Sequence, residues 1–121
     1  MYVFAIQIQN LPRADSFLVK AQGSIDMKTA PELEAACNRL LSKGEERLLF
    51  DFSNVEYINS QGLGVLLHLQ KVLSAKGGGV TVAGLSDRVK KVFLTTGIHK
   101  ILNLYEDTSE ALAHDQLFRE G

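Results

Sequence analysis

The chain has 121 residues, of which 45% are hydrophobic, and its 13 basic and 14 acidic residues leave a formal net charge of −1. This is the length of one domain around one core, and the balanced charge argues against a nucleic acid as the partner. A single cysteine and three scattered histidines argue against disulfide, metal and redox chemistry, so we expect no cofactor. No apolar run approaches the roughly eighteen residues of a membrane span, and the start lacks a signal-peptide pattern, so we expect a cytoplasmic protein without direct membrane insertion.

Two short strands open the chain. Hydrophobic residues alternate, imperfectly, over residues 2–9, and a second apolar run covers residues 16–23 after the turn-rich sequence NLPRAD. This pattern predicts an antiparallel hairpin.

A helix is predicted over residues 28–44. Thr29 with Glu32 three residues later has the spacing of a capping box, and Gly44 suits the exit of the helix. Cys37 falls on the apolar stripe of this helix, so we expect it to pack in the core rather than to act as a reactive thiol.

The middle of the chain predicts a buried strand followed by a buried helix. Residues 46–55 form a short apolar run with little alternation, as expected for a central strand covered on both faces. The helix is predicted to begin at Ser60 and to extend to about Lys76, where three consecutive glycines stop it. Residues 79–84 then predict another strand.

The last third predicts a helix over residues 86–97 with Ser86 as its cap, a strand over 100–107 and a terminal helix over 108–121. The helix over residues 86–97 has a core stripe and a basic face, which could be solvated or could meet an acidic partner. The predicted stripe is Val89, Val92, Phe93 and Thr96, and the basic residues are Arg88, Lys90 and Lys91.

Together these elements predict one α/β domain over residues 1–121. Strands separated by helices of ten or more residues imply parallel neighbours, and the opening hairpin adds an antiparallel pair. We therefore expect a mixed sheet of about five strands with an N-terminal hairpin, covered by about four helices. Functional sites in such sheets gather where strands end and helices begin.

Ser60 lies at such a junction, and its local chemistry leaves two interpretations open. A helix N-terminus has unpaired N–H groups and favours anions, so the position could accept a phosphate. Gly62 and Gly64 each cost about 1 kcal/mol in helix propensity and could let a partner approach closely. Alternatively, Ser60 is an N-cap and the glycines only permit tight packing of the helix on the sheet.

Catalysis by this chain is not predicted. The sequence NSQG is not the G-x-S-x-G elbow of hydrolases, and the glycine-rich patterns of nucleotide-binding loops are incomplete.

Several segments together resemble the STAS domain, specifically the bacterial anti-sigma factor antagonists. They are GSIDMKTAPEL, LLFDFSNVEYINSQGLGVLL, GGGVTVAGLSDRVKKVFLTTGIHKIL and a short acidic strand before the final helix, and the match covers about residues 4–115. In that family a serine of the middle segment is phosphorylated by a partner anti-sigma factor that is itself a serine kinase, and a phosphatase resets it. The resemblance implies a STAS fold, Ser60 as the phosphorylation site and Asp26 as an acidic contact near it.

The resemblance also implies a partner-binding surface and a mechanism. Besides Asp26, the implied surface consists of Asn59, Gln61, Gly62, Leu63 and Gly64, with Leu63 equally compatible with the core. The unphosphorylated chain would sequester the anti-sigma factor and free a sigma factor, and phosphorylation would release the partner. We expect no enzymatic activity of the chain itself, and a monomer or weak dimer.

Three departures from the family pattern keep a second interpretation open. Asn59 stands where the family usually has aspartate, Gln61 where it has serine or threonine, and Ser24 where it has an acidic residue. The lost charge beside Ser60 could alter selection by a kinase. In the second interpretation the domain is a non-switching subunit of a transporter or of a multiprotein sensory complex.

Overall fold

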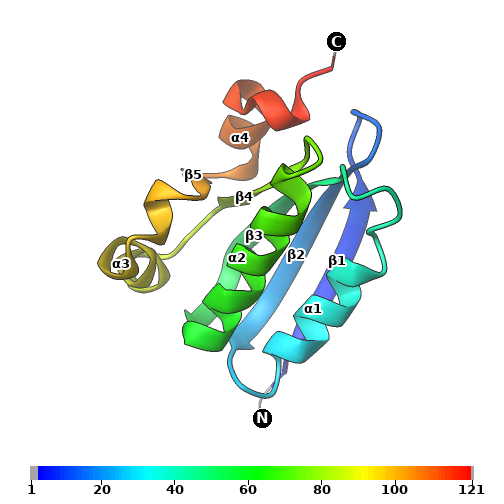
Figure 1. The fold of residues 1–121 in the computed structure, drawn as a ribbon. Coiled ribbons are helices and arrows are strands. Elements are labelled where there is room, and N and C mark those ends of the chain that lie inside the picture. The colour runs from blue at the N-terminus through cyan, green and yellow to red at the C-terminus, as the bar shows by residue number, and fades with distance from the viewer. Residues whose placement is uncertain (1–2, 121) are drawn as a thin grey trace.

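The computed structural model describes residues 3–120 as five strands, four α-helices and two short 3₁₀ turns (Figure 1). The strands are β1 (Ala5–Asn10), β2 (Ser16–Ile25), β3 (Arg47–Ile58), β4 (Gly79–Ala83) and β5 (Asn103–Tyr105). The helices are α1 (Ala30–Asn38), α2 (Ser60–Ser74), α3 (Asp87–Thr96) and α4 (Thr108–His114), with 3₁₀ turns η1 (Ile98–Lys100) and η2 (Gln116–Phe118). The predicted order of elements is confirmed. The predictions that reach residues 1, 2 and 121 lie outside the described residues.

The strands form one mixed sheet in the order β1-β2-β3-β4-β5. β1 pairs antiparallel with β2, which confirms the hairpin, and the other three pairs are parallel. Because β2 and β3 run in the same direction, their carboxyl ends meet at one edge, where Ile25 pairs with Ile58. This edge is where α1 and α2 begin.

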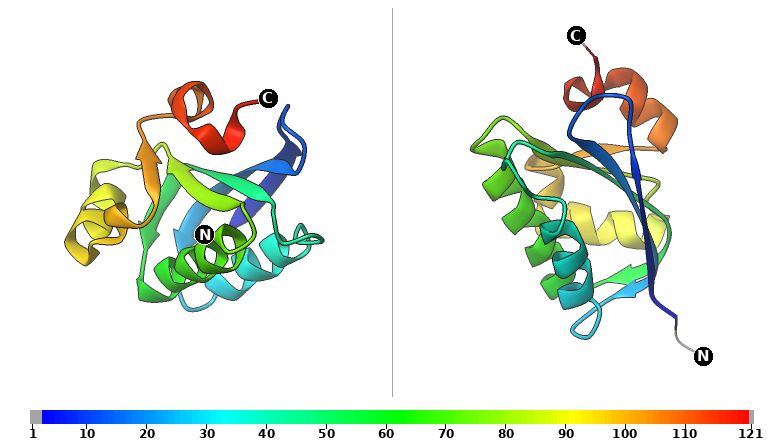
Figure 2. Two further views of the ribbon diagram at one scale, coloured as in Figure 1. Left: turned by 45° about the horizontal axis from the view of Figure 1, so that its top comes forward. Right: turned by 90° about the vertical axis from the view of Figure 1, so that its right-hand side faces the viewer.

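Two hydrophobic clusters lie on opposite faces of the sheet. The larger cluster joins the sheet to α1, α2 and α3 and contains the fully buried rings of Phe50, Phe52 and Phe93. The smaller cluster lies under α4, where Leu49 packs in one cluster with Ala111. In the right-hand view of Figure 2, α1 and α2 lie on one side of the sheet and α4 lies near the other. The first part of β3 is therefore covered on both faces, as predicted, but Ser53 and Asn54 are exposed, so the prediction is wrong for that part of residues 46–55.

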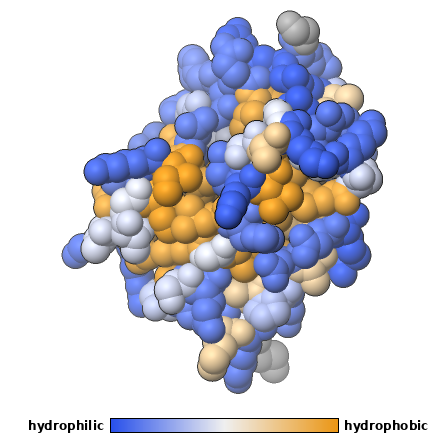
Figure 3. All heavy atoms as spheres, viewed as in Figure 1, coloured by the Kyte–Doolittle hydropathy of each residue, from blue (hydrophilic) through white to orange (hydrophobic). Residues whose placement is uncertain are grey.

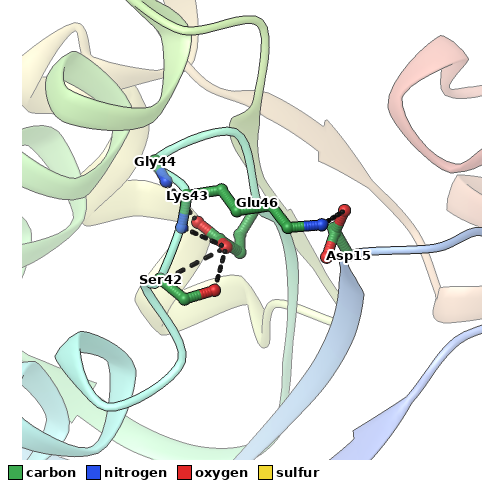
Figure 4. Close-up of polar contacts among 5 residues, drawn as sticks. All are labelled: Asp15, Ser42, Lys43, Gly44 and Glu46. Carbon is green, nitrogen blue, oxygen red and sulfur yellow. Dashed lines mark hydrogen bonds and ion pairs between the residues drawn. The ribbon is translucent and has the colours of Figure 1, made fainter.

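α1 ends at Asn38, so the prediction of a helix up to Gly44 is wrong. The backbone N–H groups of Ser42, Lys43 and Gly44 donate to the Glu46 carboxylate, with N–O distances of 3.2, 3.1 and 2.9 Å (Figure 4). These groups are satisfied by a side chain from the start of β3 rather than by helical carbonyls. Burial alone raises the pKa of Glu46, but these hydrogen bonds outweigh it and lower the pKa below its ordinary value.

The predicted capping box at Thr29 is also wrong. Thr29 occupies the N-cap position of α1 in a helical backbone conformation, and its hydroxyl makes no cap hydrogen bond. The hydroxyl instead donates to the carbonyl of Ser24 at 2.7 Å and accepts from the N–H of Asp26 at 2.9 Å. These bonds order the turn between β2 and α1.

α3 agrees with its prediction except at one residue. The Ser86 hydroxyl caps the helix by accepting from the N–H of Val89 at 3.2 Å, and Val89 and Phe93 are buried. Thr96 is exposed, and its hydroxyl donates to the carbonyl of Val92 at 2.8 Å, so its place in the core stripe is wrong. None of the helices within residues 3–120 combines the length and apolar composition that a membrane crossing requires.

Candidate functional site

The carboxyl ends of β2 and β3 bring two chain segments together. The N–H of Asn59 donates to the carbonyl of Ile25 at 3.0 Å, which places the turn after β2 beside the N-terminus of α2. Asp26, Met27, Lys28 and Asn59 line one open hollow there. The structure therefore brings Asp26 to the junction that carries Ser60, although the two are far apart in sequence.

Asn59, not Ser60, caps α2. The Asn59 side-chain oxygen accepts from the N–H groups of Gln61 and Gly62 at 3.0 and 3.2 Å. Its amide group donates to the side-chain oxygen of Gln61 at 3.1 Å. Asn59 has the extended backbone of an N-cap residue, while Ser60 is already the first residue of the helix. The interpretation of Ser60 as the cap is wrong, because asparagine caps as well as serine and comes first.

The hydroxyl of Ser60 therefore does not cap the helix. The side chain is exposed, and within residues 3–120 it makes no hydrogen bond. It stands at a helix N-terminus whose first turn carries no acidic residue. An enzyme can reach this oxygen, and a group added to it would extend into solvent or into a partner.

The two glycines of α2 have different surroundings. A Cβ atom built on Gly62 would lie 2.6 Å from Ile25 Cγ2 and 2.7 Å from Ile58 Cγ1. A Cβ atom on Gly64 would meet nothing within 4 Å. Gly62 is thus explained by packing against the strand ends, whereas nothing inside the described chain explains Gly64.

Leu63 is buried in the larger core cluster at 4% exposure. The choice left open for Leu63 between core and surface is decided in favour of the core. Gly62 is buried as well. These two residues support the predicted partner-binding surface from beneath and do not offer it atoms of their own.

Asp26 organises the turn in which it lies. Its Oδ1 accepts from the N–H groups of Lys28 and Thr29 at 2.9 and 3.2 Å. These bonds hold Met27 outward, with 67% of its surface exposed. The sequence analysis missed Met27 and Lys28 as site residues. An apolar residue within the otherwise polar turn between a strand and a helix was the available signal.

We call the exposed or partly exposed residues at this junction the Ser60 surface. They are Asp26, Met27, Lys28, Asn59, Ser60, Gln61 and Gly64. Gly64 belongs to it because residues four apart lie on the same face of a helix, and both Ser60 and Gly64 are exposed. Met27 gives this surface an exposed apolar side chain.

The three basic residues of α3 have different contacts, although Arg88 and Lys91 border the same hollow. The guanidinium carbon of Arg88 lies 5.5 Å from the centre of the Tyr57 ring, a cation–π contact, and Lys90 lies 3.6 Å from Glu106. Lys91 is exposed and borders a hollow that also contains Val92. Figure 3 shows apolar surface across the middle of this side of the molecule, between hydrophilic margins.

Cys37 packs in the core, as predicted. Its side chain is fully buried, and burial, together with the nearby Glu34 carboxylate, raises the pKa of the thiol to about 12. Within residues 3–120, no group of three or more histidine, cysteine, aspartate or glutamate side chains could hold a metal ion.

A model of the STAS domain matches residues 5–111. The chain belongs to the STAS domain family. It is 28% identical over 103 residues to an anti-sigma-B factor antagonist of Staphylococcus epidermidis, covering 85% of this chain and 95% of that protein. The crystal structure of an anti-sigma factor antagonist from Mycobacterium paratuberculosis has a TM-score of 0.81 at 28% identity, covering 92% of both chains.

SpoIIAA, an anti-sigma factor antagonist, shares this STAS fold at lower identity. Its unphosphorylated form has a TM-score of 0.75 at 20% identity and covers 89% of this chain and 93% of that one. The phosphorylated form from Bacillus has a TM-score of 0.69 at 19% identity and covers 90% of this chain and 97% of that one. At these identities the likeness shows the fold alone.

Proposed function

We propose that this STAS domain is an anti-sigma factor antagonist whose binding to its partner is controlled by phosphorylation of Ser60. The partner is an anti-sigma factor with serine kinase activity, and a phosphatase restores the unmodified serine. The chain acts in the cytoplasm as a substrate and binding protein rather than as an enzyme. One observation carries the proposal: the Ser60 hydroxyl is exposed and plays no part in capping the helix on which it stands.

The unmodified Ser60 surface is suited to close contact with a protein. Gly64 leaves the helix bare beside Ser60, so a partner backbone can approach α2 directly. Met27 offers an exposed apolar side chain, and buried apolar anchors supply much of the binding energy of interfaces. Asp26 places a carboxylate in the same hollow as Asn59, where a basic partner residue could meet it.

A phosphate on Ser60 would oppose this contact. It brings about −1.5 to −2 charges, and a partner packed over α2 would have to desolvate it. Asp26 adds a negative charge at the same junction. We expect a cost of several kcal/mol, and every 1.4 kcal/mol is tenfold in affinity, so two or three such steps release the partner.

The same phosphate should leave the fold almost unchanged. The helix cap is the Asn59 side chain, which the modification does not touch. Because asparagine is uncharged, it caps α2 without the repulsion that an aspartate would exert on a neighbouring phosphate. The departure of Asn59 from the family pattern is thus compatible with phosphorylation of the next residue, although it changes what a kinase would recognise.

The test begins with the partner. The chain is incubated with its cognate anti-sigma factor and ATP, the phosphorylated residue is located by mass spectrometry, and binding is measured by isothermal titration calorimetry. We expect phosphate on Ser60, and we expect Ser60→Asp to weaken binding at least about tenfold with an unchanged melting temperature. Ser109→Asp is the matched control, because Ser109 is another exposed serine in the first turn of a helix, α4.

Three outcomes would count against the proposal. Unimpaired binding of the Ser60→Asp chain would show that negative charge at this position does not control the contact. An unlabelled Ser60 in a stable complex would favour a non-switching STAS subunit of a transporter or of a multiprotein sensory complex. Loss of affinity in the Ser109→Asp control would show that the effect is not specific to the Ser60 surface.

A further inference from the structure

β1 is an edge strand without the usual protection. Among the described residues it pairs only with β2, and all six of its residues keep one uninterrupted register. Its sequence AIQIQN contains no charge and no proline. Natural edge strands usually carry such residues, or a bulge, because their outer N–H and C=O groups otherwise pair with another chain. The outer side of β1 is therefore open to a further strand.

A groove of about 310 Å³ lies beside this edge, between β1 and α1. Apolar side chains of β1 line one wall, and residues of α1 line the other. The lining residues are Phe4, Ile6 and Ile8 from β1 and its preceding residue, and Glu32, Ala36 and Arg39 from α1 and its end. Ile8 is 39% exposed, so a partner that covered the groove would remove apolar surface from water.

The charges in this groove indicate what covers it. Glu32 and Arg39 are seven residues apart, about 10 Å along the helix axis, and the small side chain of Ala36 lies between them. Both are exposed, and within residues 3–120 neither forms an ion pair. The groove thus carries one unpaired charge of each sign at its two ends.

We propose that a second copy of this chain binds here, with β1 pairing antiparallel to β1 of the partner subunit about a two-fold axis. α1 leads from the end of β2 to the start of the parallel strand β3, so it runs opposite to β2, as β1 does. Glu32 therefore lies toward the start of β1 and Arg39 toward its end. The two-fold axis exchanges these ends, so Glu32 of each copy faces Arg39 of the other, and the patch is self-complementary.

This dimer leaves the Ser60 surface free. The axis joins two five-stranded sheets edge to edge and points their Ser60 surfaces in opposite directions. Self-association through β1 is thus independent of the proposed phosphorylation and of any anti-sigma factor. One strand pair and one groove make a small interface, so we expect an association that is visible only at high protein concentration.

Sedimentation velocity over a wide concentration range tests the proposal, with Ile8→Asp as the disrupting variant. The short charged side chain would be buried against the partner strand, so the dissociation constant should rise about tenfold or more. Val72→Asp is the matched control, because Val72 is 38% exposed on α2, away from β1. The control should change the constant by no more than about twofold.

Charge reversal provides the sharper readout. Glu32→Arg gives a groove with two positive charges and Arg39→Glu one with two negative charges, so each variant alone should dimerise less. An equimolar mixture of the two should form a heterodimer more readily than either variant forms its own dimer. The double variant Glu32→Arg, Arg39→Glu keeps complementarity and should dimerise like the unchanged chain. Circular dichroism establishes that each variant is folded.

Three results would overturn the proposal. The unchanged chain could sediment as a single copy at every concentration. Its dimer could be indifferent to Ile8→Asp, which would place the interface elsewhere. The mixture of oppositely charged variants could fail to associate while both are folded, which would remove the contact between Glu32 and Arg39.

Discussion

Alanine substitutions at Gly62 and Gly64 should change stability in opposite directions. At Gly64 the new methyl group meets no heavy atom within 4 Å, so only the better helix propensity of alanine acts. The free energy of unfolding should rise by about 1 kcal/mol, and the melting temperature by about 4 °C for a chain of this size. At Gly62 the methyl group would lie under 3.0 Å from Ile25 and from Ile58. Such overpacking costs about 1–3 kcal/mol against a propensity gain of about 1 kcal/mol, so we expect a net loss of up to about 2 kcal/mol.

Binding to the anti-sigma factor should show the reverse order. Gly64→Ala adds a methyl group to the Ser60 surface. Although this variant should be the more stable one, it should bind more weakly, by about tenfold if the partner backbone contacts α2 there. Gly62→Ala changes buried packing, so its folded fraction should bind with nearly unchanged affinity. Thermal melts followed by circular dichroism give the stabilities, and isothermal titration calorimetry gives the affinities.

The two measurements can refute the two halves of this reasoning separately. A higher melting temperature for Gly62→Ala would mean that the strand ends yield easily and that packing does not require this glycine. An unchanged affinity for Gly64→Ala would remove α2 at that position from the contact with the partner.

Three other predictions concern the cap of α2, the Glu46 carboxylate and the Cys37 thiol. Asn59→Ala should lower the free energy of unfolding by about 1 kcal/mol because it removes the cap of α2, whereas Ser60→Ala should change it by less than about 0.5 kcal/mol. Urea denaturation measures both changes, and equal losses would contradict the assignment of the cap to Asn59. Glu46→Gln should cost about 2 kcal/mol at neutral pH, since hydrogen bonds to a carboxylate are lost. Because the pKa of Glu46 is lowered in the folded state, its contribution to stability is fully present above the unfolded pKa near 4.5 and is lost as the pH falls through the folded pKa. Glu46→Gln should therefore lose less stability on acidification than the unchanged chain. Parallel profiles of stability against pH would refute this. Cys37, with its pKa raised to about 12 by burial, should react with a thiol reagent at neutral pH only as fast as the chain opens, and rapid labelling of the folded protein would contradict it.

The elements of the fold follow from local patterns, but several of their ends do not. The hairpin, the central strand and α2 were predictable because periodicity and glycine signals agree over many residues. The end of α1 was not, because the Glu46 carboxylate, which follows in sequence, accepts the N–H groups of residues 42–44 that a longer helix would have used. No propensity of the residues before Gly44 reveals that contact.

The sequence indicates the centre of the candidate site but not its margins. Ser60 stands out because polar residues interrupt two apolar runs, and the family resemblance adds Asp26. Which neighbour caps the helix depends on the backbone angles at Asn59, and the sequence leaves both residues eligible. In the sequence Met27 stands out only as an apolar residue in a polar turn, and its position beside Asn59 is seen only in the structure.

The proposed control of partner binding depends on two adjacent residues having different roles, one as the helix cap and the other as the phosphorylation site. If Ser60 were the cap, phosphorylation would replace its hydroxyl by phosphate oxygens as the acceptor of the first N–H groups, and the modification would alter α2 as well as any interface. With Asn59 as the cap, those groups keep their acceptor in both states. The effect of the phosphate on the protein can then appear almost entirely as a change in affinity for the partner. The variant Asn59→Asp should therefore keep the helix cap. It should lower the affinity of the unphosphorylated chain for a partner that recognises an uncharged residue at this position. An increased affinity would show instead that the partner recognises the aspartate that is usual in the family.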